Sequence, residues 1–171
     1  MNIFIVSTDP IKAARMLCDK HIVKMPVETA QMLTYVNNRP SGIAHVNHPC
    51  TLWAGSCKYN YEWLVAHGLE LCDEYERRYG RVHASKAVIE SWRVAKTTMS
   101  HQFSSFVQCM PEQYQRDEIT LAYRLYYHSK FQIAQWKHSE KPDWYIGMLG
   151  ILYPERVKGE TELILKPIER S

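Results

Sequence analysis

Apolar side chains recur every three or four positions through most of this chain, which is the spacing of a helix that buries one face. Turn-forming or proline-containing stretches separate the periodic segments. A short helix is predicted from Pro10, because Thr8 or Asp9 followed by proline is typical of a first helical turn. The pattern therefore predicts an all-α fold of four to five helices. The longer ones are expected over residues 20–35, 49–79, 85–99 and 117–136.

Single residues refine the expected helix boundaries. Asp19 and Ser85 are the predicted N-caps of two helices, and Asp117 is predicted to open the last long one. Pro26 lies inside the first long helix, where proline removes a hydrogen bond and clashes with the preceding turn. We therefore expect a kink or a restart of that helix near Pro26.

The two ends of the chain lack helical periodicity. Residues 3–6 are a short apolar run, and residues 163–165 alternate within the tail. These runs either pair as a minor two-stranded element that joins the termini, or residues 3–6 form a tucked-in arm. The tail, residues 155–171, is expected to pack loosely.

Length and composition favour one domain. The chain has 171 residues, of which 46% are hydrophobic, so it can bury a core and we expect a single helical domain over residues 1–171. No stretch approaches the ~20 apolar residues that a membrane span needs, and the first residues lack the basic segment of a secretion signal. We therefore expect a cytoplasmic protein with no membrane partner.

Cysteine and histidine spacing gives no metal signature. The five cysteines are an odd number without a C-x-x-C pair, and the eight histidines are scattered without an H-x-x-x-H pair. This argues against a disulfide framework and against a zinc finger. We expect buried free thiols, no metal and no cofactor.

A stripe of polar side chains along the first long helix is the main candidate for chemistry. On an ideal helix His21 and Glu28 lie roughly 10 Å apart along the axis with an offset of about 20°, and Lys24 lies between them. Gln31 extends the stripe by one turn. Lysine and histidine can hold a phosphate while Glu28 stabilises a cationic transition state. The alternative interpretation is a solvated face with a Lys24–Glu28 ion pair.

The C-terminal half interleaves aromatic and basic residues in a chain of net charge +3. Cations can neutralise phosphates, and rings can stack on bases or wedge between them. Since many of these aromatics also fall at core spacing, the alternative is a core with a solvated rim. The side chains predicted to contact DNA are Arg124, Lys137, Lys141, Trp144 and Tyr145.

Three short motifs resemble a known family. Asp19-x-His21-Ile22-x5-Glu28 resembles the Asp-x-His-Leu-x5-Glu pattern of the phage pyrimidine-dimer DNA glycosylases of the endonuclease V type. Lys141-Pro-Asp-Trp144-Tyr145 is similar to their Pro-x-Trp-Tyr element. Asn47-His48-Pro49 is similar to an element of some cellular relatives, although His48 is equally a local helix cap. Over residues 1–145 the chain also resembles a widespread set of uncharacterised phage proteins.

The resemblance implies a compact all-α enzyme that binds duplex DNA, kinks it and extrudes a base. In the family an N-terminal α-amine attacks the anomeric carbon of the sugar and forms an imine, a glutamate assists, and strand cleavage follows. The matching glutamate here is Glu28, and the matching histidine beside the lesion is His21. A phage-encoded chain would act in the host cytoplasm.

The chain departs from the family at its start. The size of Asn2 argues against removal of Met1, and Ile3 and Val27 stand where the family has arginines. The longer lead before Asp19 also shifts the N-terminus relative to Glu28. The nucleophile is therefore left open between an N-terminal amine, a lysine (Lys20 or Lys24) and a water activated by Glu28.

We predict a DNA glycosylase that cleaves the N-glycosidic bond of a damaged or modified pyrimidine in duplex DNA, with lyase activity as an open point. Glu28, His21 and Lys24 are the predicted catalytic residues. One rival is a non-catalytic DNA-binding or host-takeover module on the same scaffold, and the other is an N-glycoside enzyme that acts on free nucleotides. The predicted DNA or substrate contacts are Asp19, Lys20, Gln31, Asn47, His48, Arg124, Lys137, Lys141, Trp144 and Tyr145.

Overall fold

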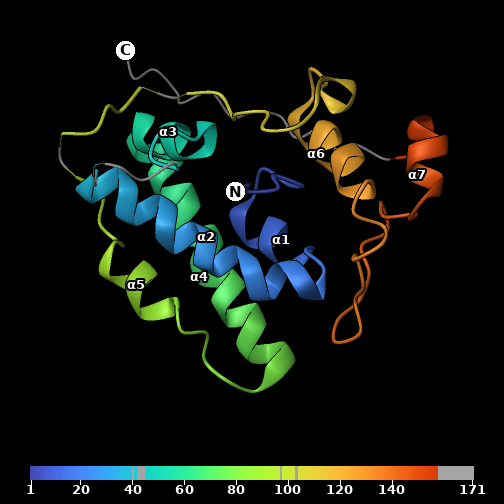
Figure 1. Ribbon diagram of the computed structural model, residues 1–171, viewed down its shortest axis with the longest axis horizontal. Helices are drawn as coiled ribbons and strands as arrows, with labels where there is room; N and C mark the ends of the chain where they lie inside the picture. The colour runs from blue at the N-terminus through green and yellow to red at the C-terminus, as the bar shows by residue number, and fades with distance from the viewer. Residues whose placement is uncertain (40, 42–44, 97, 103, 158–171) are drawn as a thin grey trace, which may run out of the picture.

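Helices make up the regular secondary structure of this protein, in agreement with the predicted all-α class (Figure 1). The computed structural model describes residues 1–39, 41, 45–96, 98–102 and 104–157. Within these residues there is no strand, and the predicted partner run at 163–165 lies outside them. The α-helices are α1 (Pro10–Arg15), α2 (Asp19–Asn38), α3 (Pro49–Ser56), α4 (Lys58–Tyr79), α5 (Lys86–Ser91), α6 (Ile119–His128) and α7 (Leu149–Leu152), with 3₁₀ turns at Glu112–Tyr114 and Pro154–Arg156.

The two longest helices, α2 and α4, form the centre of the molecule, and α4 also packs against α1, α3 and α5 (Figure 1). Their facing sides supply fully buried side chains such as Ile22, Leu33 and Leu64. Gly68 of α4 faces α2 so closely that a β-carbon there would lie 2.4 Å from Cγ2 of Thr29. Glycine at this position therefore sets how closely the two helices approach. Described residues contain no helix long and apolar enough to cross a membrane.

Several predicted helix boundaries are corrected by the structure. The segment predicted as one helix over 49–79 is broken at Cys57, whose φ of −154° and ψ of 164° are extended, so it forms α3 and α4. The side-chain amide of Asn60 donates to the Trp53 carbonyl (3.1 Å) and to Ser56 Oγ (3.0 Å), which satisfies the end of α3. The predicted helices at 85–99 and 117–136 end earlier, at Ser91 and His128. Apolar spacing continues past both ends because the loops that follow also pack against the core.

Helix starts follow the prediction at Asp9 and at Ser85, the N-cap residue of α5, and differ at Asp19 and Asp117. Asp9 caps α1, and its Oδ1 accepts hydrogen bonds from the amides of Ile11 and Lys12. Asp19 is the first residue of α2 and does not cap it. Glu118, and not Asp117, caps α6. In both cases the predicted residue is one position away from the observed cap.

Pro26 does not interrupt α2, which runs unbroken through it, so the predicted restart is wrong. Proline leaves the carbonyl four residues earlier without its usual amide donor. The neighbouring Val23 carbonyl lies 3.1 Å from Nε2 of His83. Tertiary packing along the buried side of α2 therefore outweighs the local cost of the proline.

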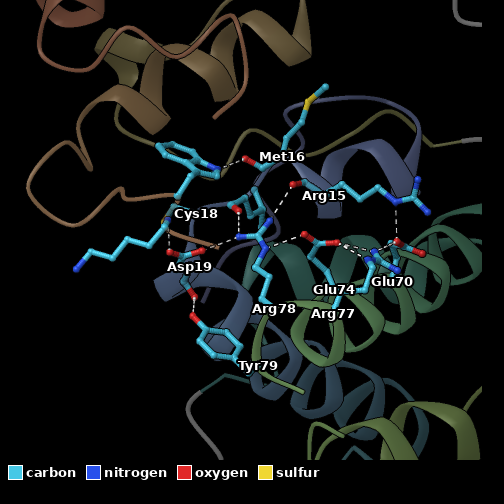
Figure 2. Close-up of polar contacts among 12 residues, drawn as sticks. Arg15, Met16, Cys18, Asp19, Glu70, Glu74, Arg77, Arg78 and Tyr79 are labelled. Carbon is cyan, nitrogen blue, oxygen red and sulfur yellow. Dashed lines mark hydrogen bonds and ion pairs between the residues drawn. The ribbon is translucent and has the colours of Figure 1, made fainter. Parts of the chain in front are cut away.

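Arg78 of α4 is the centre of a buried polar network (Figure 2). Its side chain is 1% exposed and donates to the carboxylates of Glu74 (2.7 Å) and Asp19 (3.0 Å). It also donates to the carbonyls of Arg15 (3.1 Å) and Leu17 (3.0 Å) at the end of α1. One guanidinium thus joins α1, α2 and α4, and its buried charge is balanced by two carboxylates.

Residues 3–6 form a buried arm and not a strand, in agreement with one of the two predictions for this run. Phe4 has a positive φ of 45° and stacks on His21, with ring centroids 4.6 Å apart. The Val6 carbonyl accepts a hydrogen bond from Nε of the buried Arg124 (3.0 Å). These contacts hold the start of the chain between α2 and α6.

Candidate functional site

A hollow of about 240 Å³ lies where the arm, α2 and the end of α6 meet. His21, Lys24 and Glu28 line one side of it, as their spacing on one helix predicts. Met1 and Asn2 line another side, and Lys130, just after α6, lines a third. The structure therefore brings the three predicted catalytic residues together in one cavity.

The carboxylate of Glu28 is the most densely contacted group in this hollow. Its Oε2 accepts a hydrogen bond from the main-chain nitrogen of Asn2 (2.9 Å) and lies 3.9 Å from the α-amino group of Met1. Its Oε1 pairs with Nζ of Lys24 at 2.9 Å. The Glu28 side chain is only 10% exposed, so these contacts act in a partly desolvated setting where charge interactions are stronger than in water.

The side chain of Asn2 fixes the arm against Glu28. Its Oδ1 accepts from the amides of Ile3 (2.8 Å) and Phe4 (3.0 Å), and its Nδ2 donates to the carbonyl of Cys109 (2.7 Å). Three hydrogen bonds from one side chain leave the first main-chain nitrogens little freedom. The two nitrogens at the start of the chain are thus held toward one oxygen of Glu28.

His21 is an uncharged group in this site. Burial, followed by the positive charge of Lys24, lowers the pKa of His21 to about 4. Its Nδ1 lies 2.7 Å from the hydroxyl of Tyr127, which already accepts from the Cys18 amide. A neutral imidazole has one donor and one acceptor nitrogen, and Nδ1 is occupied by the Tyr127 hydroxyl, so Nε2 is left for a ligand. His21 can therefore form a hydrogen bond with a ligand at neutral pH, but it carries no positive charge there.

Lys130 brings a second ammonium group to the hollow. Its Nζ lies 3.1 Å from the hydroxyl of Tyr126 and 4.2 Å from the centre of that ring. Lys24, with a side chain 64% exposed, lines the same hollow. Two ammonium groups and one carboxylate therefore face the same space, which favours an anionic ligand beside the carboxylate.

A second hollow of about 370 Å³ adjoins the first, because Ile133 lines both. Lys20 and Lys137 line it, and both are exposed. Asp19, a predicted substrate contact, also lines it, but its carboxylate bonds Arg78 and the amide of Lys137 (2.7 Å). Asp19 therefore fastens the loop after α6 to α2.

Other predicted contacts are scattered over the surface. Gln31 and Lys141 are exposed and line neither hollow. Asn47 lines a separate hollow of about 440 Å³ beside Arg39 and Lys96. His48 caps α3, where its Nδ1 accepts from the Cys50 amide at 3.2 Å, as the local interpretation predicts.

Three predicted DNA contacts are buried, so their side chains cannot touch DNA directly. Arg124 is 1% exposed, Trp144 5% and Tyr145 4%. The guanidinium of Arg124 lies over the ring of Trp144, 5.5 Å from its centre. The rings of Tyr145 and Trp136 are 4.6 Å apart. The alternative interpretation, that this region is core, therefore describes these three side chains better. They support the wall of the site from inside the protein.

The sequence did not single out the arm as part of the site. Tyr126 and Lys130 belong to the aromatic and basic region that was considered for DNA contacts, but the sequence did not connect them with Glu28. The arm carries no helical periodicity, and its position depends on contacts with Cys109 and Arg124 that are distant in sequence. A polar Asn2 directly before the apolar run at 3–6 was the available signal, since an apolar run next to a polar end favours a buried segment with its polar end at a surface.

Comparison with known protein families finds a match for the first half of this chain. Residues 1–87 match the family model described as pyrimidine dimer DNA glycosylase, which is half of the chain and includes His21, Lys24 and Glu28. No curated protein and no solved structure matches.

Proposed function

The chain belongs to the pyrimidine dimer DNA glycosylase family, and we propose that it cleaves the N-glycosidic bond of a damaged or modified pyrimidine in duplex DNA. The observation that carries this proposal is the meeting of an α-amine and a mostly buried carboxylate in one hollow, with Met1 N 3.9 Å from Glu28 Oε2. An amine next to a carboxylate can form a covalent intermediate with a sugar.

The proposed nucleophile is the α-amine at the start of the chain. Its nitrogen lone pair attacks the anomeric carbon of the sugar, the bond to the base breaks, and the base leaves with the bonding pair and takes up a proton. The attacking nitrogen then gives up a proton, the bond from the anomeric carbon to the ring oxygen breaks, and that oxygen is protonated, which leaves an imine. The imine makes the adjacent sugar–phosphate bond prone to elimination, so the proposal includes lyase activity. If Met1 is removed, the nitrogen of Asn2 becomes this amine, and it already lies 2.9 Å from Glu28.

Glu28 is proposed to accept a proton from the amine and to stabilise the positive charge that develops on the sugar. Its Oε2 faces the amine, while Oε1 is held by Lys24. His21, which is neutral, is proposed to form a hydrogen bond with the extruded nucleotide through Nε2. Its ring is held in place by Phe4 and Tyr127.

DNA binding is proposed to use the lysines around the two adjoining hollows. Lys24 and Lys130 stand at the first hollow, and Lys20 and Lys137 at the second. Each ammonium that neutralises a phosphate releases counterions, which makes binding dependent on salt. Base extrusion costs a few kcal/mol, which these phosphate contacts would offset.

The test is borohydride trapping of the full chain on duplex oligonucleotides that carry an abasic site, an ultraviolet pyrimidine dimer or a hydroxymethylated pyrimidine. Borohydride reduces an imine to a stable protein–DNA adduct, and peptide mapping identifies the bonded nitrogen. Lys24→Gln is compared with Lys58→Gln, since Lys58 forms the same type of pair with Glu62 on another helix. We expect the adduct at Met1 or Asn2 in the parent and in both variants.

Other results would change the assignment. An adduct at Lys20 or Lys24 would transfer the nucleophile to that lysine. Base release without an adduct would indicate a water activated by Glu28. Salt-dependent DNA binding without adduct or release would favour a binding module, and tight mononucleotide binding with weak duplex binding would favour a free-nucleotide enzyme.

A further inference from the structure

A pair of cysteines and a histidine form a second polar cluster behind the arm. His48 and Cys50 lie at the start of α3, and Cys109 lies in the loop before the first 3₁₀ turn. One nitrogen or sulfur atom from each lies within 4.8 Å of the others. Cys50 is fully buried, whereas Cys109 is partly accessible to solvent. The proposed glycosylase chemistry uses none of these three groups.

The hydrogen bonds of His48 determine which chemistry the cluster favours. Its Nδ1 accepts from the Cys50 amide (3.2 Å), and burial, followed by the charge of the N-terminus, lowers the pKa of His48. A neutral ring that accepts at Nδ1 carries its proton on Nε2. Nε2 lies 3.7 Å from Sγ of Cys109, so its N–H is available to that sulfur. A metal at Nε2 would have to displace this proton and disturb the cap of α3, which favours sulfur chemistry over metal binding.

Cys109 has the environment of a reactive thiol. The neighbouring Cys50 thiol lowers the pKa of Cys109, burial opposes this effect, and the positive N-terminus adds to the lowering. The Cys109 sulfur and burial raise the pKa of Cys50, which therefore stays a thiol. A thiolate is the nucleophilic form of cysteine, and a neighbouring thiol can resolve its oxidised form.

We propose that Cys50 and Cys109 are an oxidisable pair that a hydroperoxide converts into a disulfide. In the first step the Cys109 thiolate attacks the peroxide, the O–O bond breaks, and the products are Cys109 sulfenic acid and, with one proton, water or an alcohol. In the second step Sγ of Cys50 attacks the sulfenic sulfur, the S–O bond breaks, and water leaves with the Cys50 proton. The two sulfurs lose two electrons in total, and the peroxide gains them.

Disulfide formation would move the loop and not the helix. The sulfurs must approach to about 2.05 Å, and Cys50 is held within α3 while Cys109 lies in irregular chain. The Cys109 carbonyl accepts from Nδ2 of Asn2, whose Oδ1 holds the amides of Ile3 and Phe4. Oxidation therefore loosens the arm that carries the α-amine. Any effect of this loosening on base removal depends on the glycosylase function proposed above.

The first measurement is oxidation of the reduced full chain by hydrogen peroxide, followed by intact mass and non-reducing peptide mapping. We expect a loss of about 2 Da that dithiothreitol reverses, and one cross-linked peptide pair that contains Cys50 and Cys109. Cys109→Ser and Cys50→Ser should abolish the cross-link, whereas Cys72→Ser, at a buried thiol whose pKa is raised to about 12, should not. The map of the parent decides the question even where a variant does not fold.

Several results would overturn the proposal. They are a sulfinic acid on Cys109 without a cross-link, oxidation no faster than that of Cys72, or stoichiometric Zn²⁺ binding that protects both thiols. The link to the arm is read by hydrogen exchange of an N-terminal peptide that contains Ile3 and Phe4. We expect roughly five- to tenfold faster exchange after oxidation, as loss of one ordinary hydrogen bond implies. Unchanged exchange would refute the link, and none of these readouts depends on glycosylase activity.

Discussion

Two buried ion clusters in this molecule use the same ingredients in different ways. In one, the guanidinium of Arg78 is enclosed by the carboxylates of Glu74 and Asp19 and by two carbonyls (Figure 2). In the other, Glu28 holds Lys24 and the start of the chain at the wall of a hollow. The Arg78 side chain is 1% exposed, whereas that of Lys24 is 64% exposed.

The difference teaches what separates a structural ion cluster from a reactive one. The guanidinium of Arg78 is enclosed by fixed partners, so this cluster serves to hold helices together. Beside Glu28 there is room for a substrate, and the amine is 3.9 Å away, longer than a hydrogen bond. We therefore expect substitutions in the first cluster to change stability and substitutions in the second to change activity.

The largest effect is expected from Glu28→Gln, which keeps the shape of the side chain and removes its charge. Base release in single turnover should fall by about a thousandfold, because both proton transfer and stabilisation of the sugar cation are lost. Glu62→Gln, at the partner of Lys58 on α4, is the matched control and should leave the rate unchanged. Equal rates for the parent and Glu28→Gln would refute the role of this carboxylate.

Arg78→Met should mainly destabilise the fold. It leaves the carboxylate of Asp19 without its cation and that of Glu74 with only the half-exposed Arg77, which costs about 3–5 kcal/mol in the free energy of unfolding. Arg77→Met is the control, since the Arg77 side chain is 48% exposed and its loss should cost about 1 kcal/mol or less. Urea denaturation measures both values. Similar losses in the free energy of unfolding for the two variants would show that the enclosed Arg78 stabilises the fold no more than the exposed Arg77.

His21 should make stability depend on pH. Its pKa is about 4 in the folded protein and about 6.5 when exposed, so the unfolded chain takes up the proton first as pH falls. This contribution to stability is complete above pH 6.5 and is lost progressively between pH 6.5 and 4, by about 2 kcal/mol at pH 5. Relative to the parent, His21→Gln should reduce the slope of stability against pH by this amount, whereas the exposed His138→Gln should retain it. The buried His67, whose pKa is lowered to about 3 by burial, contributes to the slope in both variants.

The smallest effect is expected from the surface lysines of the second hollow. Replacement of Lys20 and Lys137 by glutamine should reduce the slope of log K against log salt for duplex binding by about 2, which is roughly 0.9 per lost phosphate contact. Fluorescence anisotropy over a salt series measures the slope. Lys58→Gln on α4 should leave it unchanged, and an unchanged slope in the double variant would remove this hollow from the DNA interface.

The sequence predicted the relative positions of the site residues well where all of them lie on one helix. The polar stripe of His21, Lys24 and Glu28 depends only on helical geometry, and the structure places all three in one hollow. The start of the chain was harder to predict, because a longer lead before Asp19 suggested that it lies away from Glu28. The fold of the arm, fastened through Asn2 to Cys109, takes up that extra length.

In the aromatic and basic region of the C-terminal half, the sequence did not predict the role of the side chains. Composition alone cannot tell a ring that stacks on DNA from a ring in the core, and Trp144 and Tyr145 are in the core. The broken helix at Cys57 was missed for a similar reason, since the apolar period continues on both sides of one extended residue. Periodicity reports burial, and tertiary contacts decide where the backbone turns.

The close approach of α4 to α2 at Gly68 has a consequence for protein engineering. A search for stabilising substitutions would choose Gly68→Ala, since alanine in a helix interior is usually favoured over glycine by about 1 kcal/mol. Here the new methyl group would collide with Thr29, the residue that follows Glu28. A substitution made to raise thermal stability would therefore shift the helix that carries the carboxylate. Stability and activity would conflict at a position that lines neither hollow of the site.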